Sequence, residues 1–247
     1  GTLDLVRGEW RRFENTLDPT DTDTSDDGTD FDSQAINIQE NGDRLPIHYV
    51  TPPGVQLEEL YFNNTLIPQN EQSLALRVDG DGLEPGDSRA VFKNVSVDMR
   101  QFKKLKMFVH AEAPSDDVIA LEDDEMVGFI RFGNDFTENF YQVEIPLKKT
   151  QFGDHSAEGV WPESNRIDIS MELLTKLKIL AMNHVYTPGE IFYRNEDDPD
   201  MNPSASGKVN KLKIGIRGNP NFGLVRTLMV GVKNQTDDLN TPQHPLN

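Results

Sequence analysis

The sequence predicts a mainly β fold, an antiparallel, jelly-roll-like β-sandwich with one short helix. Between Gln72 and Val232, apolar residues recur at every second position in short runs, which is the periodicity of half-buried strands. Gly, Asp, Asn and Pro separate these runs and are the residues that antiparallel turns require. One stretch in this region has helical spacing, whereas a parallel sheet needs a crossover helix for each strand.

The first 70 residues differ in composition from the rest and are predicted to form N-terminal strands and an acidic loop, as part of a preceding unit. Residues 3–13 predict one or two strands. Residues 18–32 contain seven Asp and no Lys or Arg, so they have no apolar face and predict a loop. Short runs that begin at Ile36 and end at Tyr49 predict extended segments, the second of which enters a tight bend at 52–54.

The main sandwich domain is predicted to cover residues 71–234. Its clearest strands lie at residues 73–78, 105–111, 141–145, 212–216 and 228–232, each with apolar side chains on one face. Apolar residues at 173–181 have helical spacing, with Ser170 or Asp168 available as the N-cap. Residues 235–247 are rich in Asn and Pro and predict a polar tail.

Charge and cysteine content exclude several classes of function. The chain carries 42 acidic and 24 basic residues, a net charge of −18, which repels phosphate backbones and anionic lipid headgroups. Nucleic acid is therefore excluded as a partner. The absence of Cys excludes disulfides, thiolate metal sites and a thiol nucleophile. The chain begins at Gly1 without a leader or an apolar run long enough to span a bilayer as a helix, and we interpret it as a soluble fragment of a longer protein.

Two acidic turns are candidates for weak calcium binding. Asp23, Ser25 and Asp27 place oxygen atoms at alternate positions before Gly28, as in a calcium loop. The EF-hand pattern then fails, because Gln34 occupies the position of the bidentate Glu. Asp79, Asp81 and Asp87 form the second candidate. A solvated acidic loop is the favoured interpretation of both, and no other cofactor is expected.

No pattern of catalytic residues is present, so the chain is predicted not to be an enzyme. Acidic residues crowd 112–125 and 196–200, but a glycosidase needs two carboxylates at a defined separation, which sequence cannot select. The five His are dispersed, and the closest pairing, His110 with Glu112 on one strand face, lacks a third metal ligand.

Four aromatic residues could form a sugar-stacking platform, although core packing is the favoured interpretation of all of them. They are Trp161, Tyr141, Phe140 and Phe132. This platform is the basis of the alternative function, a carbohydrate-binding module on the cell surface.

Several motifs in a fixed order resemble one known family. They are residues 6–13 (VRGEWRRF), 52–55 (PPGV), 70–74 (NEQSL), 89–93 (RAVFK), 99–112 (MRQFKKLKMFVHAE), 129–133 (FIRFG) and 160–163 (VWPE). This series resembles the SprA, or Sov, family, the giant outer-membrane translocons of the type 9 secretion system of Bacteroidetes, which gliding motility requires. The resemblance runs across nearly the whole chain.

The resemblance implies a non-catalytic structural or interaction domain of a protein translocon. The chain would be a soluble segment between strands of a very large β-barrel in the outer membrane of a Gram-negative bacterium, on the cell-surface side. Its implied partners are other secretion-system proteins and the cargo proteins in transit. The resemblance implies no active-site residue that could be assigned to a position in this chain.

Overall fold

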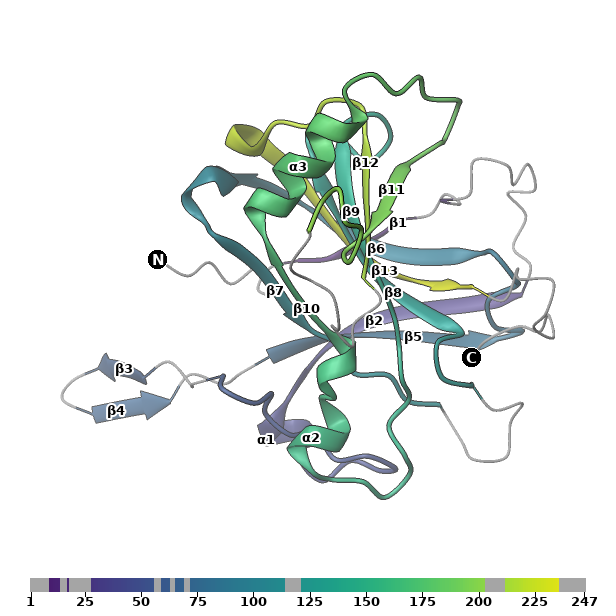
Figure 1. Cartoon of the computed structure of the whole chain (residues 1–247). Helices are drawn as coiled ribbons and strands as arrows, with labels where there is room; N and C mark the ends of the chain where they lie inside the picture. The colour runs from purple at the N-terminus through teal and green to yellow at the C-terminus, as the bar shows by residue number, and fades with distance from the viewer. Residues whose placement is uncertain are drawn as a thin grey trace.

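The protein folds as antiparallel β-sheets with a few short helices (Figure 1). The structure, a computed structural model, describes residues 9–13, 17, 28–55, 59–62, 65–68, 72–113, 121–202 and 212–235. The mainly β class predicted from the alternating apolar residues is confirmed.

A seven-stranded antiparallel sheet forms the centre of the fold, with the strand order β1-β6-β13-β8-β9-β12-β11. Its strands are β1 (Arg11–Phe13), β6 (Ser88–Val97), β8 (Met126–Gly133), β9 (Phe140–Pro146), β11 (Phe192–Asn195), β12 (Lys213–Arg217) and β13 (Val225–Asn234). On β9, Tyr141, Val143 and Ile145 are buried on one face, as their alternation predicts. We call this face, which carries the largest core cluster, the inner face.

Helix α3 (Met171–Ala181) and the strand pair β7 (Lys104–Phe108) and β10 (Arg166–Ser170) pack on the inner face. The helix forms where the sequence predicted it, because Leu173, Leu174 and Leu177 fall on one side and are buried. The Ser170 hydroxyl accepts a hydrogen bond from the Leu173 backbone N–H at 3.2 Å, which confirms Ser170 as the N-cap.

A second strand pair, β2 (Thr29–Asn37) and β5 (Gln72–Gly80), covers another part of the inner face. Phe31 and Val78 pack with Leu83 and with Val91 of β6 in a separate core cluster. Residues 29–32 were predicted to lie in the acidic loop, and this prediction is wrong. Pairing with β5 buries Phe31 while Asp30 and Asp32 stay exposed, so composition alone misjudged a strand with a single apolar anchor.

Strand β2 ends at Asn37, one residue after Ile36, and Asn37 is the N-cap of helix α1 (Ile38–Asn41). The Asn37 side chain accepts a hydrogen bond from the Glu40 N–H at 2.9 Å and caps this helix. The remaining elements are β3 (Glu59–Phe62), β4 (Thr65–Pro68), α2 (Ala157–Val160) and the 3-10 helices η1 (Met99–Gln101), η2 (Glu163–Asn165) and η3 (Phe222–Leu224). Strands β3 and β4 pair with each other, at the left of Figure 1.

The layering bears on two further predictions. Opposite the large sheet lie two separate strand pairs, β7–β10 and β2–β5, so the jelly-roll order stays a prediction. Strands β1 and β2 come from the first 70 residues and pair with β6 and β5 of the predicted main domain, and the division into units near residue 70 stays a prediction. Of the predicted polar tail, only Gln235 lies within the described residues. None of the helices in the described ranges has the length and apolar character that crossing a membrane would require.

Candidate functional site

The predicted acidic turn at Asp79, Asp81 and Asp87 is built into the fold by hydrogen bonds and ion pairs. Asp79 pairs with Arg77, whose Nε lies 2.5 Å from its carboxylate. Asp87 accepts a hydrogen bond from the Ser88 N–H at 2.6 Å and pairs with Arg89. Two of the three carboxylates are thus engaged by neighbouring cations.

Among the residues that the structure describes, no three His, Asp or Glu side chains come close enough to hold a metal ion. Asp23, Ser25 and Asp27 lie outside the described residues, so weak calcium binding there stays a prediction. Calorimetric titration of the chain with calcium tests it, and an absence of heat at millimolar metal would count against it.

His110 and Glu112, which share a strand face by sequence, are hydrogen-bonded, with 2.9 Å between His110 Nε2 and Glu112 Oε2. The other ring nitrogen of His110 lies 2.9 Å from the carbonyl oxygen of Val160 and 3.1 Å from the hydroxyl of Thr150. Glu112 also pairs with Arg44. Partial burial acts to raise the pKa of Glu112, but the hydrogen bond from His110 and the charge of Arg44 outweigh it and hold that pKa below its ordinary value. His110 therefore contacts Thr150 and Val160, Glu112 contacts Arg44, and the hydrogen bond between His110 and Glu112 links these two parts of the chain.

Trp161 lies in a core cluster with Ile47, Tyr49 and Val160 and is 8% exposed. Its indole N–H donates to the carbonyl oxygen of Val50 at 2.7 Å. Tyr141, Phe140 and Phe132 are also buried. Core packing is therefore confirmed for all four aromatic residues, and none of them is available as a sugar platform.

The most developed polar site, which the sequence analysis missed, is on the face of the large sheet opposite the inner face, here called the outer face. Strand pairing places Arg131 of β8 opposite Gln142 of β9, Gln142 opposite Gly215 of β12, and Gly215 opposite Tyr193 of β11. These four residues form one row across four adjacent strands, and all of them point to the same face.

Hydrogen bonds join the row to Glu144, two residues along β9. The Nε of Arg131 donates to Gln142 Oε1 at 2.6 Å, and Gln142 Nε2 donates to Glu144 Oε1 at 2.7 Å. The hydroxyl of Tyr193 donates to the same carboxylate oxygen and accepts from Gln142 Nε2 at 3.0 Å. The network is buried: Arg131 is 7% exposed, and Gln142 and Glu144 are 5% exposed.

Gly215 is what allows Tyr193 to reach this network. A Cβ atom at residue 215 would lie 2.5 Å from Cε1 of Tyr193 and 2.6 Å from Cγ2 of Ile191. The tyrosine ring therefore lies over the glycine and extends to Gln142 and Glu144. Lys213, on the same strand as Gly215, places its Nζ 4.4 Å from the centre of the tyrosine ring.

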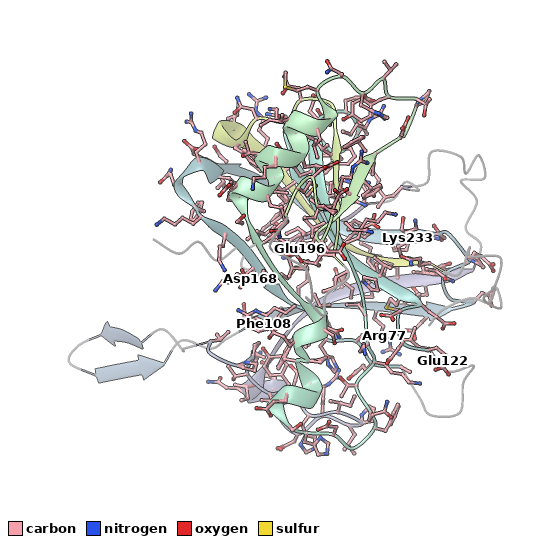
Figure 2. All side chains as sticks on the ribbon, viewed as in Figure 1. Arg77, Phe108, Glu122, Asp168, Glu196 and Lys233 are labelled. Carbon is pink, nitrogen blue, oxygen red and sulfur yellow. The ribbon has the colours of Figure 1, made fainter. Side chains whose placement is uncertain are left out.

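A cavity of about 210 Å³ lies beside this row. Its lining residues are Leu17, Gly86, Ser88, Phe129, Arg131, Gln142, Glu144, Gly189, Ile191, Tyr193 and Lys233. Lys233, labelled in Figure 2, lies near the C-terminal end of β13. Burial lowers the pKa of Arg131 to about 10, and burial together with the charge of Glu144 raises that of Tyr193. Arg131 is charged and Tyr193 is neutral at pH 7, so the site presents a cation, a phenol and an already hydrogen-bonded carboxylate.

These residues gave only a weak sequence signal. Arg131, Gln142 and Glu144 alternate with apolar residues, a pattern that normally places polar groups in water. The burial of the polar side follows from nonlocal pairing with β11 and β12, which no local pattern specifies. The chemistry of the site suits binding and positioning, because the Glu144 carboxylate is held by two donors rather than poised over a nucleophile.

A family model described as motility related/secretion protein, SprA_N, matches residues 1–244. A search of curated proteins finds no match to the chain.

Proposed function

The chain belongs to the SprA_N family of motility related/secretion proteins, and we propose that it is a non-catalytic structural and interaction domain of an outer-membrane protein translocon. The translocon is that of the type 9 secretion system of Bacteroidetes, which gliding motility requires. The observation that carries this proposal is the family match across residues 1–244, together with the ordered series of motifs that resembles the same family.

The geometry of the fold supports a scaffold. The seven-stranded sheet is packed on its inner face by α3 and two strand pairs, and the largest core cluster joins residues from seven of these elements: β7, β8, β9, β10, β12, β13 and α3. Such a sheet holds its loops in fixed positions. The one histidine–carboxylate pair that sequence had singled out, His110 with Glu112, is engaged by Val160, Thr150 and Arg44, which supports a structural role.

The charge of the chain supports a role in partner selection. A net charge of −18 repels anionic surfaces and leaves proteins with basic patches as the favoured contacts. We propose that these contacts are other secretion-system proteins and transiting cargo, and that the domain faces the cell surface. The alternative of a carbohydrate-binding module loses its stacking residue, because Trp161 is buried.

A pair of substitutions on one helix tests the scaffold role in the full-length parent. Leu174→Asp places a charge in the core, whereas Ile179→Asp changes a side chain that is 61% exposed on the same helix. We expect Leu174→Asp to reduce cargo secretion and partner co-purification while Ile179→Asp leaves both unchanged. In-frame deletion of residues 72–234 that leaves secretion and partner assembly intact would refute the proposal.

The proposed location has its own test. The chain contains no Cys, so Met182→Cys, at a position 75% exposed, adds a single thiol to this segment. A maleimide that cannot cross membranes is expected to label this variant on intact cells, above the level of the unsubstituted parent. Labelling only after the outer membrane is opened would place the domain on the periplasmic side.

A further inference from the structure

We propose that the cavity on the outer face binds a carboxylate group, with Arg131 and Lys233 as its cationic contacts. The group can belong to a small organic acid or to the free end of a peptide. This inference rests on the cavity itself and is independent of the proposed role in secretion.

The first argument is the state of Arg131. This side chain is 7% exposed, and its hydrogen bonds go to neutral oxygens, those of the Gln142 side chain at 2.6 Å and the Phe136 backbone at 2.7 Å. The guanidinium also lies 4.1 Å from the centre of the Phe140 ring. Within the described ranges, no carboxylate oxygen lies within ion-pair distance of it. The charge of Glu144 favours the guanidinium, but a buried cation without an anion in direct contact is still costly, so an anion that enters the cavity is stabilised there.

Glu144 acts on Arg131 through its charge but does not supply an anion in direct contact with it. Its Oε1 accepts hydrogen bonds from both Gln142 and Tyr193, and Arg131 reaches it only through the amide of Gln142. The carboxylate is therefore oriented by its own donors. What remains for a ligand is the second terminal nitrogen of Arg131, which has no acceptor among the described residues.

Lys233 provides the second argument. It lines the same cavity from β13, and in the described part of the chain it makes no ion pair. Arg131, Lys233 and Glu144 together give the cavity wall a net charge of +1, in a chain whose net charge is −18. A local cationic site within a strongly acidic protein attracts a ligand with a single negative charge. The bound ligand then neutralises the net charge of the cavity wall.

The same wall favours a carboxylate over a phosphate. A planar guanidinium matches a carboxylate in shape, and the second negative charge of a phosphate would face Glu144. The cavity, of about 210 Å³, is also smaller than the roughly 300–1,000 Å³ of pockets for drug-sized ligands, so it admits a small group or the end of a chain. Phe129, Leu17 and Ile191 provide apolar contacts for the carbon part of such a ligand.

The test is an NMR titration of the 247-residue chain, with the Arg131 Nε–H resonance and its backbone neighbours as the readout. Butyrate is compared with butyramide, which has the same size and no charge. Acetyl-trialanine with a free C-terminus is compared with its C-terminal amide, and inorganic phosphate is titrated separately. We expect saturable shifts at Arg131 for at least one of the two carboxylates, with at least tenfold weaker binding of the matching amide.

Lys233→Gln is expected to weaken carboxylate binding about tenfold, because one charge-assisted contact is lost. Lys104→Gln, on the exposed side of the β7–β10 pair, is the matched control and is expected to change nothing. Saturation by butyrate alone identifies a small acid as the source, and saturation by the peptide alone identifies a chain end. Equal binding of acid and amide, stronger binding of phosphate, unchanged affinity in Lys233→Gln, or no saturable response at Arg131 would each overturn the proposal.

Discussion

The substitution Trp161→Ala distinguishes a role of this residue in the core from a role as a sugar-stacking platform. Trp161 packs against Tyr49 with 6.3 Å between ring centres and against Phe108 with 6.4 Å, and its N–H donates to Val50. Replacing a buried Trp by Ala leaves a cavity and typically costs about 3–5 kcal/mol in the free energy of unfolding. Because whole domains are stable by roughly 5–15 kcal/mol, this loss is readily measured by urea denaturation.

Trp161→Phe divides that loss into packing and hydrogen bonding. It keeps most of the apolar volume but leaves the Val50 carbonyl without its donor, so we expect a smaller loss of about 1–3 kcal/mol. Val185→Ala, at a position 86% exposed, serves as the control and should be neutral. Far-UV circular dichroism is the suitable signal, because it does not depend on the tryptophan that is removed. A loss below about 1 kcal/mol for Trp161→Ala, or a loss of glycan-array binding with unchanged stability, would refute the core assignment.

Three further substitutions test local features of the fold by the same denaturation assay. Gly215→Ala should cost about 1–3 kcal/mol and shift the Tyr193 resonances, because its Cβ would meet the tyrosine ring at 2.5 Å, whereas Gly128→Ala, with its nearest contact at 3.4 Å, should be tolerated. Equal effects of the two would show that the ring does not lie over residue 215. Ser170→Ala removes the N-cap of α3 and should cost about 1 kcal/mol, and an unchanged midpoint would contradict the capping role. Glu112→Gln should destabilise the protein near pH 7. Since folding lowers the pKa of Glu112, its stabilising effect is present above the ordinary value of 4.5 and is lost as pH falls through the lower folded value, so the two stability curves should converge in acid. Curves that diverge on acidification would reverse the sign of the pKa shift.

The sequence was most informative where one local pattern determines the structure. Alternation at Tyr141, Val143 and Ile145 predicted β9, because a strand with one buried face places every second side chain in the core. The spacing of the leucines and the hydroxyl of Ser170 predicted α3 and its first residue to within a few positions. The family resemblance, drawn from motifs spread over the chain, agrees with the match across residues 1–244.

The predictions failed where a strand depends on its partner. Residues 29–32 are mostly polar and acidic, and they form a strand because β5 supplies a complete ladder and Phe31 supplies one buried anchor. Strand β1, in contrast, was predicted within residues 3–13, although its three residues are also held by pairing with β6, some 80 positions away in the chain. Composition reports what a segment can bury, whereas pairing across the fold decides which segments are strands.

The outer-face row shows why its polar residues could not be assigned from the sequence. Because alternate residues of a strand point to opposite faces, a shift of one position between β9 and β12 would turn Gly215 away from Gln142 and bring an isoleucine side chain against the polar row. The bond from Gln142 to Tyr193 therefore exists in one register of β9 and β12 only, and the bond from Arg131 to Gln142 requires the register of β8 and β9 in the same way. Each polar side chain in the row makes at least one hydrogen bond in that register, and in any other register these groups would be buried without those partners, which costs more than the bonds themselves contribute. The row thus favours one alignment of the four strands. The same alignment places Arg131, the cation of the row, beside the cavity.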